Sequence, residues 1–182
     1  MSKHWETIVV SSDTHIPFHS IPLHKSFLKF LSDIKPDRFI LLGDILDLHS
    51  MGSYHQNSLY YLKQVSLSDE YKAGNIVLDE YDSVVGSRVK KTFIYGNHEA
   101  RFFTWIKTGD HSKLGDELIS PSTALKLKER GYEVYDDWMN SYVQISDWTF
   151  MHGDSTAVNV ANTMLMKSLS NIVFGHCHRP VS

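Results

Sequence analysis

The sequence has only one cysteine, no long hydrophobic run and almost no excess of charge. Cys177 cannot close an intramolecular disulfide by itself, so we expect a protein of a reducing compartment, the cytoplasm. No apolar stretch is long enough to cross a bilayer, and residues 1–10 lack the apolar centre of a signal peptide, so no membrane partner is expected. The 18 Lys and Arg against 21 Asp and Glu give a net charge of −3, which excludes a general attraction to nucleic acid. Any phosphate binding must be local.

The length and the histidine content narrow the expectation further. A chain of 182 residues, 42% hydrophobic and 21% charged, has the composition of a globular protein, and it contains no repeat, low-complexity tract or linker. We therefore expect a single domain over residues 1–182. The chain has 11 histidines, and histidine is the commonest metal ligand among side chains. Their positions are the first clue to function.

Five short apolar runs, rich in β-branched and aromatic residues, have the length of buried strands. They are Thr7–Val10, Phe39–Leu42, Thr92–Tyr95, Trp148–Met151 and Ile172–Phe174. Two further short strands are expected at Val134–Tyr135 and Tyr142–Ile145. The second of these should form a hairpin with Trp148–Met151 across Ser146-Asp147.

Helices are predicted between these strands from apolar residues at helical spacing and from residues that stop helices. The predicted segments are 23–34, which ends at Lys35-Pro36; one or two helices over Leu59–Val85, with Gly74 and Gly86 as break or end; Arg101–Lys107; Ser122–Arg130; and Ser155–Leu169, capped by Asp154 or Ser155. Residues 109–122 are typical of a surface loop. Strands that alternate with helices predict a layered α/β fold, and we expect the five apolar runs to share one sheet.

Side chains that bind metals follow each of the five apolar runs. They are Asp13 and His15, Asp44, Asn97 and His98, His152, and His176 and His178. In an open α/β sheet the ligand crevice lies outside the carboxyl ends of the strands, so all five runs direct donors to one rim. A single Asp or His after a strand is more often a helix cap or an ordinary surface or core residue. Five such coincidences at one edge favour a metal site.

The spacing within two of these clusters supports the same interpretation. Asp13 and His15 are two residues apart, as are His176 and His178. In extended backbone, residues two apart point to the same side of the strand, so both members of each pair should face the site. The residue between them should then point away.

Five motifs carry a resemblance to a known family. They are Asp13-Thr14-His15, Gly43-Asp44-Ile45-Leu46-Asp47, Gly96-Asn97-His98-Glu99, His152-Gly153-Asp154 and Gly175-His176-Cys177-His178. In this order, and over nearly the whole chain, they resemble the pattern of the calcineurin-like metallophosphoesterases. The resemblance implies an α/β fold of mixed β-sheets flanked by helices, with the metal site at the carboxyl ends of the strands. Members of this family commonly continue past the last motif into a further closing strand, so the chain is expected to be a short or truncated member at its C-terminus.

The resemblance also implies a role for each motif residue. Asp13, His15 and His178 would bind one metal ion, Asn97, His152 and His176 would bind the other, and Asp44 would bridge the two. His98 would protonate the leaving oxygen, with Asp47 holding its imidazole and Glu99 as the second candidate for that task. The cofactors would be two divalent transition-metal ions, with Mn favoured and Fe, Zn, Co or Ni as alternatives.

This donor set predicts a reaction class. Two divalent ions about 3.5–4 Å apart clamp an in-line displacement at phosphorus and activate a bridging hydroxide. We expect metal-dependent hydrolysis of phosphate esters, first as a phosphodiesterase or nuclease whose substrate is a nucleotide or nucleic acid. A phosphomonoesterase or nucleotide phosphatase is the close alternative, and a non-catalytic interaction scaffold of the same fold is the second. Retention of His98 argues against the scaffold, and Leu48 stands where Ser/Thr protein phosphatases have arginine. The sequence leaves the oligomeric state open.

Residues outside the motifs supply weaker candidates. Candidate phosphate contacts are Arg101, His49, His111 and Arg179, although a solvated surface is the simpler interpretation for all of these but His49. Tyr54, Tyr60 and Tyr61 follow Asp44 where a substrate-facing wall would lie, but core positions of the next helix explain them as well. Cys177 is expected to pack as a small core residue. No role is assigned to His4, His19, His24 and His55.

Overall fold

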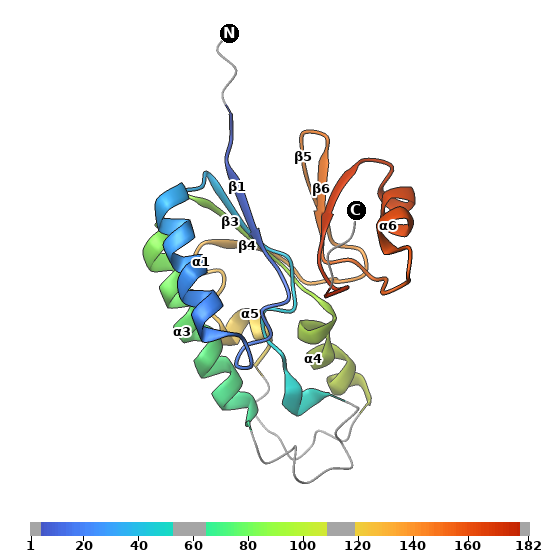
Figure 1. The fold of residues 1–182 in the computed structure, drawn as a ribbon. Coiled ribbons are helices and arrows are strands. Elements are labelled where there is room, and N and C mark those ends of the chain that lie inside the picture. Colours follow the sequence, from blue (N-terminus) through green and yellow to red (C-terminus); the bar gives the residue numbers. More distant parts are fainter. Residues whose placement is uncertain (1–4, 53–64, 109–118, 179–182) are drawn as a thin grey trace.

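The computed structural model describes residues 5–52, 65–108 and 119–178, and its strands form two sheets (Figure 1). The first sheet has four parallel strands, paired in the order β1 (Ile8–Ser11), β2 (Arg38–Leu41), β3 (Lys90–Ile94) and β4 (Tyr132–Tyr135). The second sheet contains β5 (Val143–Ile145), β6 (Trp148–Met151) and β7 (Asn171–Phe174). Strand β6 pairs antiparallel with β5, as the hairpin prediction requires, and parallel with β7. The architecture is therefore α/β with one parallel and one mixed sheet.

The prediction that all five apolar runs share one sheet is wrong, because β6 and β7 belong to the second sheet. A continuous apolar run shows that both faces of a strand are buried, but it does not show whether a helix or another sheet covers them. Here helices α1 (Ile21–Ile34) and α3 (Leu67–Val85) cover one face of the first sheet, and the second sheet covers the other. Helix α6 (Val160–Ser168) lies against the outer side of the second sheet (Figure 1).

Strand β2 shows how the apolar pattern divides between these layers. Successive side chains of a strand point to opposite faces. Phe39 and Leu41 accordingly pack in the core beneath α1 and α3, whereas Ile40 and Leu42 pack against Phe150 of the second sheet. All five side chains are at least nine-tenths buried. This packing holds the two sheets face to face and brings the carboxyl ends of their parallel strands to the same end of the molecule.

The first two helices follow their sequence signals closely. Helix α1 ends at Ile34, and its cap residue Lys35 adopts the left-handed conformation before Pro36. Helix α3 runs without interruption through Gly74, where a Cβ would come within 2.6 Å of the Leu46 side chain, so glycine allows close packing there and does not break the helix. The helix ends at Gly86. Residues 59–64 of the predicted helical stretch lie outside the described residues.

The later helices differ from prediction at their boundaries. Helix α4 (Asn97–Thr108) begins four residues before the predicted Arg101. The predicted helix over 122–130 is wrong, since α5 (Pro121–Ala124) gives way to turns in which Lys126 has a φ of +53°. The predicted helix over 155–169 begins only at Val160, after the cap residue Asn159. The predicted caps Asp154 and Ser155 lie before this helix, and the Asp154 carboxylate accepts from Lys167 at 2.6 Å.

Among the residues that the structure describes, no helix is both long and apolar enough to cross a bilayer.

Candidate metal centre

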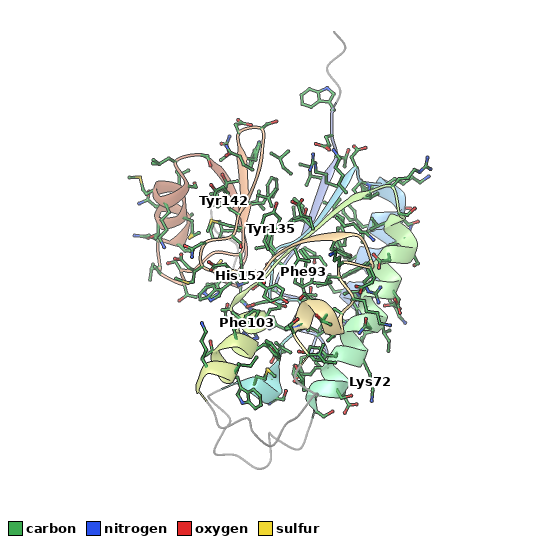
Figure 2. All side chains as sticks on the ribbon, turned by 180° about the vertical axis from the view of Figure 1, so that it is seen from behind. Lys72, Phe93, Phe103, Tyr135, Tyr142 and His152 are labelled. Atoms are coloured by element: carbon green, nitrogen blue, oxygen red, sulfur yellow. The ribbon has the colours of Figure 1, made fainter. Side chains whose placement is uncertain are left out.

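The predicted donors meet at the end of the molecule where the parallel strands of both sheets terminate. Asp13 and His15 follow β1, Asp44 follows β2, Asn97 and His98 open α4 after β3, and the remaining histidines follow β6 and β7. His152 is fully buried and lies in the interior where the two sheets meet (Figure 2). Side chains from both sheets therefore build this site.

The donors form two groups that share Asp44. One group contains Asp13, His15, Asp44 and His178, the other contains Asp44, His152 and His176, and within each group the ligand atoms lie within 4.8 Å of one another. Asn97 adjoins the second group, since its Oδ1 lies 3.1 Å from Nε2 of His152. Imidazole nitrogens, carboxylate oxygens and an amide oxygen that converge in this way are the donors that borderline divalent ions bind, so the residues fit two such ions.

Paired imidazoles show how closely each group converges. The ring centroids of His152 and His176 are 5.1 Å apart, and those of His15 and His178 are 4.8 Å apart. In the latter pair the two Nε2 atoms face each other at 3.1 Å. Two imidazole nitrogens this close share one proton or one cation.

Hydrogen bonds behind the donors fix which ring nitrogen faces the centre. Nδ1 of His152 donates to the carbonyl oxygen of Leu42 at 2.6 Å, and Nδ1 of His15 donates to the Asp47 carboxylate at 3.0 Å. In both residues Nε2 is therefore left with its lone pair toward the centre. Contacts of this kind orient metal-binding histidines in general. Burial alone would lower the pKa of His15, but the contact with Asp47 and the charges of Asp44 and Asp13 together raise it above its ordinary value.

Asp44 is the buried carboxylate at the middle of the site. Its Oδ2 lies 3.4 Å from Nε2 of His152 and 4.0 Å from Nε2 of His15, and its Oδ1 accepts the backbone N–H of His98 at 2.8 Å. Burial alone would raise the pKa of Asp44, but the contacts with His152 and His98 together outweigh it and lower the pKa. A Cβ on Gly96 would overlap this carboxylate, so only glycine fits there.

The backbone around the donors differs from the extended conformation that the sequence spacing suggested. Five of the donors have a left-handed φ, between +50° and +68°: Asp13, His15, Asp44, His176 and His178. That conformation is uncommon outside glycine and is found where the surrounding structure and a function require it. The prediction for the two pairs is therefore wrong in its backbone geometry. His176 and His178 in fact face different groups, one on each side of Asp44.

His98 lies beside the two groups and is held by Asp47 through an unexpected atom. Nδ1 of His98 donates to the backbone carbonyl oxygen of Asp47 at 2.7 Å, while the Asp47 carboxylate is 3.5 Å away and binds His15 instead. Nε2 of His98 lies 3.8 Å from Oδ2 of Asp44. His15, Asp47 and His98 thus form a third cluster of donors that overlaps the first group.

Arg101 occupies the open side of His98. Its Nη1 donates to the Asp47 carbonyl oxygen at 2.8 Å, and its Nη2 lies 2.9 Å from Nε2 of His98. Burial, opposed by the Asp44 charge and joined by the Arg101 charge, lowers the pKa of His98 below its ordinary value. The structure thus places this candidate phosphate contact directly beside the candidate acid.

Two buried glutamates hold the chain that follows β2. Glu99 accepts the backbone N–H groups of Asp44, Ile45, Leu46 and Gly96 at 2.8–2.9 Å, so its carboxylate orders the Asp44 turn and does not orient His98. Glu70 of α3 accepts the N–H groups of His49 and Ser50 at 3.0 Å, in the short helix η1 (His49–Met51). The role of Glu70 could not be predicted from the sequence, because a glutamate within a helix carries no signal that its partners are backbone groups.

Of the remaining weaker candidates outside the metal-binding donors, His49 and Cys177 lie among the described residues. His49 Nδ1 lies 3.8 Å from the Asp47 carboxylate, and its ring contacts Phe18. Cys177 is half-buried and belongs to none of the clusters of donors found among the described residues. His111, Arg179 and the tyrosines at 54, 60 and 61 lie outside the described residues.

The structure is a layered α/β protein in which side chains able to bind metal ions gather at the carboxyl ends of the strands. The model of the calcineurin-like phosphoesterase family matches residues 6–181, and the chain belongs to this family. Membership supports metal-dependent hydrolysis of phosphate esters.

Two phage proteins are similar to the chain over most of its length. The Gene 54 protein of Mycobacterium phage D29 is 25% identical over 191 residues, which covers 94% of this chain and 69% of the phage protein. The Gene 54 protein of Mycobacterium phage L5 is 23% identical over 188 residues, with the same coverage. Their names state no activity, so they support the fold and add nothing on substrate.

Proposed function

We propose that the chain is a phosphodiesterase or nuclease that uses two divalent metal ions. One observation carries this proposal: two groups of donors share the buried Asp44, and His98, a side chain able to deliver a proton, lies 3.8 Å from that shared carboxylate. A binding scaffold has no need for a proton donor at that position. The substrate class we favour is a nucleotide or nucleic acid.

The metal assignment follows the two groups. Asp13, His15 and His178 would hold one ion, His152, His176 and Asn97 would hold the other, and Asp44 would bridge them. When bound, such a pair of ions polarises the phosphoryl group and supplies a hydroxide nucleophile at neutral pH. Mixed nitrogen and oxygen ligands without thiolate suit Mn, with Fe, Zn, Co and Ni as alternatives.

His98 and Arg101 would act on the substrate itself. Because Nδ1 of His98 donates to the Asp47 carbonyl, Nε2 is the atom that can hand a proton to the leaving oxygen. Arg101 donates toward that same Nε2, so Nε2 can carry a proton only when the guanidinium turns to another acceptor. A phosphoryl oxygen is such an acceptor, since Arg pairs well with phosphate. Substrate binding would thus free His98 for proton transfer.

The exposure of the site favours a diester over a small monoester. The His178 side chain is 55% exposed, so one side of the first group is open to a bulky ester.

We also propose a cytoplasmic location, and the single cysteine is the only feature of the sequence that supports it.

The test is a comparison of substrates on metal-stripped protein. Bis-p-nitrophenyl phosphate and p-nitrophenyl phosphate would be assayed with Mn²⁺, Fe²⁺, Zn²⁺, Co²⁺ or Ni²⁺ restored one at a time, with Asp44→Asn as the control. We expect Mn²⁺ to restore diester hydrolysis in the unchanged protein and not in Asp44→Asn. Preference for the monoester would replace the proposal with a phosphomonoesterase, and inactivity on both esters despite bound metal would leave the scaffold.

A further inference from the structure

A separate cavity of about 230 Å³ lies behind the metal centre, beside α1, α3 and the end of β1. Its walls include two histidines to which the sequence analysis assigned no role, His19 and His24, together with Phe27 and Tyr81. The two helices that border it lie side by side (Figure 1). None of the donors of the metal centre lines this cavity, although Ser12 and Thr14, which flank Asp13 in the sequence, do.

Two imidazole nitrogens at this cavity lack a partner. Nδ1 of His19 and Nδ1 of His24 are buried and make no hydrogen bond with any residue that the structure describes. His24 is 8% exposed, so its nitrogen cannot be satisfied by bulk water. Buried polar atoms in native proteins are almost always paired, and an unpaired one calls for a ligand, an ion or an ordered water.

The other nitrogen of His24 shows how the ring is oriented. Nε2 of His24 lies 2.7 Å from the Glu80 carboxylate, which accepts its proton and leaves Nδ1 with a lone pair. His15 has the same arrangement at the metal centre, where the Asp47 carboxylate holds one nitrogen and the other faces the donor group. A carboxylate behind an imidazole is the usual support of a metal-binding histidine.

The distance between the two rings also matches the metal centre. The ring centroids of His19 and His24 are 5.3 Å apart, compared with 4.8 Å and 5.1 Å for the histidine pairs of the two donor groups. Burial and the neighbouring His24 lower the pKa of His19, which favours the neutral ring that a metal ion requires.

We propose that His19 and His24 bind a further divalent transition-metal ion through their Nδ1 atoms, with water in the other positions. Two neutral imidazoles without a carboxylate among the direct ligands select a borderline ion such as Zn²⁺ and not Mg²⁺ or Ca²⁺. Glu80 supplies the negative charge that partly balances the ion through His24. This site is independent of the proposed hydrolysis, because it shares no donor with the metal centre.

The experiment counts bound Zn²⁺ per chain by elemental analysis after equilibrium dialysis against a fixed free Zn²⁺ concentration. The full chain would be compared with His19→Gln and with His24→Gln, each checked for a cooperative thermal transition. Phe27→Leu, which alters the same cavity and removes no donor, is the matched control. We expect each histidine variant to bind one equivalent fewer than the full chain, and the control to bind the same number. The expected difference holds however many ions the metal centre takes.

Two further variants keep the proposal testable if His24→Gln fails to fold. Glu80→Gln retains both donors and should weaken the extra site about 10–100-fold without abolishing it. In an Asp44→Asn background, which disturbs the metal centre, adding His19→Gln should again lower the Zn²⁺ count by one equivalent. Equal Zn²⁺ counts in the full chain and a folded His19→Gln variant would overturn the proposal and assign an ordered water to the two nitrogens.

Discussion

His98 differs from the other histidines of the site in what its two nitrogens contact. Nδ1 is held by the Asp47 carbonyl oxygen and Nε2 faces Arg101, so neither nitrogen is committed to one of the two groups around Asp44. We therefore expect His98 to affect the reaction without being required for the binding of the metal ions. That distinction can be measured.

Substitution of His98 by Asn should leave the metal content and the fold unchanged. We expect it to lower kcat by about 10²–10⁴-fold on esters with poor leaving groups, the range typical of a general acid. Esters of p-nitrophenol should suffer less, because p-nitrophenolate departs with little help from a proton. Steady-state kinetics on matched alkyl and p-nitrophenyl esters, with elemental analysis of the same samples, gives both quantities.

The outcomes of this substitution separate three roles. Equal losses on both kinds of ester would mean that His98 mainly binds phosphoryl oxygens. Loss of metal would make it a ligand, through the cluster that it forms with His15 and Asp47. Unchanged activity would return the chain to the scaffold alternative.

Asp47→Asn should act mainly on metal affinity. The Asp47 carboxylate binds Nδ1 of His15, whereas His98 is held by the backbone carbonyl oxygen, which the substitution retains. Loss of a carboxylate behind a metal-binding histidine typically weakens affinity by about 10–100-fold. We therefore expect a higher metal concentration for half-maximal activity, with only a modest change in kcat at saturating metal. A large fall in kcat that depends on the leaving group would instead show that the carboxylate serves His98.

At the scale of elements, the chain after β2 is held by carboxylates from two helices. The Glu99 carboxylate of α4 accepts the backbone N–H groups of residues 44–46, and the Glu70 carboxylate of α3 accepts those of residues 49–50. Asp47 therefore lies between two segments whose backbone is held by hydrogen bonds. Glu70 is fully buried, and burial raises its pKa from 4.5 to about 7. This group lies outside both donor groups.

The raised pKa of Glu70 predicts that this residue makes the folded protein less stable as the pH rises. Between pH 4.5 and pH 7 the folded protein binds more protons at Glu70 than the unfolded chain does, so this residue lowers stability as the pH rises through that window. Glu70→Gln cannot ionise and escapes this loss, although it gives up one acceptor oxygen. The melting temperature of Glu70→Gln relative to the unchanged protein should therefore be more favourable at pH 8 than at pH 5. A difference that stays constant across this range would contradict the prediction.

The sequence could predict the strands and the convergence of the donors, because each donor is adjacent to an apolar run and belongs to a recognisable motif. It could not predict that β6 and β7 form a second sheet, since an apolar run looks the same beneath a helix or beneath another sheet. The helix over 122–130 failed because Lys126 takes a left-handed conformation that its residue type does not favour. The hydrogen bond from His152 to the Leu42 carbonyl oxygen could not be predicted either, because every residue has a backbone carbonyl. The roles of the individual site residues stay predictions.

For the whole molecule, the most important feature is that the donors come from both sheets. Asp13, His15 and Asp44 follow strands of the first sheet, whereas His152 and His176 follow strands of the second. Apart from this site, the sheets are joined by a small core that includes Ile40, Leu42, Ile94 and Phe150. Ions bound at the centre would therefore add links between the two sheets.

Metal binding should consequently stabilise the fold, and removal of metal should destabilise it. A ligand that binds only the folded state at 100 times its Kd adds about 2.7 kcal/mol to the free energy of unfolding. For a chain of this length we expect an increase of about 5–10 °C in the melting temperature with saturating Mn²⁺, reversed by a chelator. Asp44→Asn is the matched control, because Asp44 belongs to both groups and its loss should remove most of the increase. Scanning calorimetry against Mn²⁺ concentration measures the effect. If Mn²⁺ binds, as shown by elemental analysis, and yet leaves the melting temperature of the unchanged protein where it was, the ions do not link the two sheets.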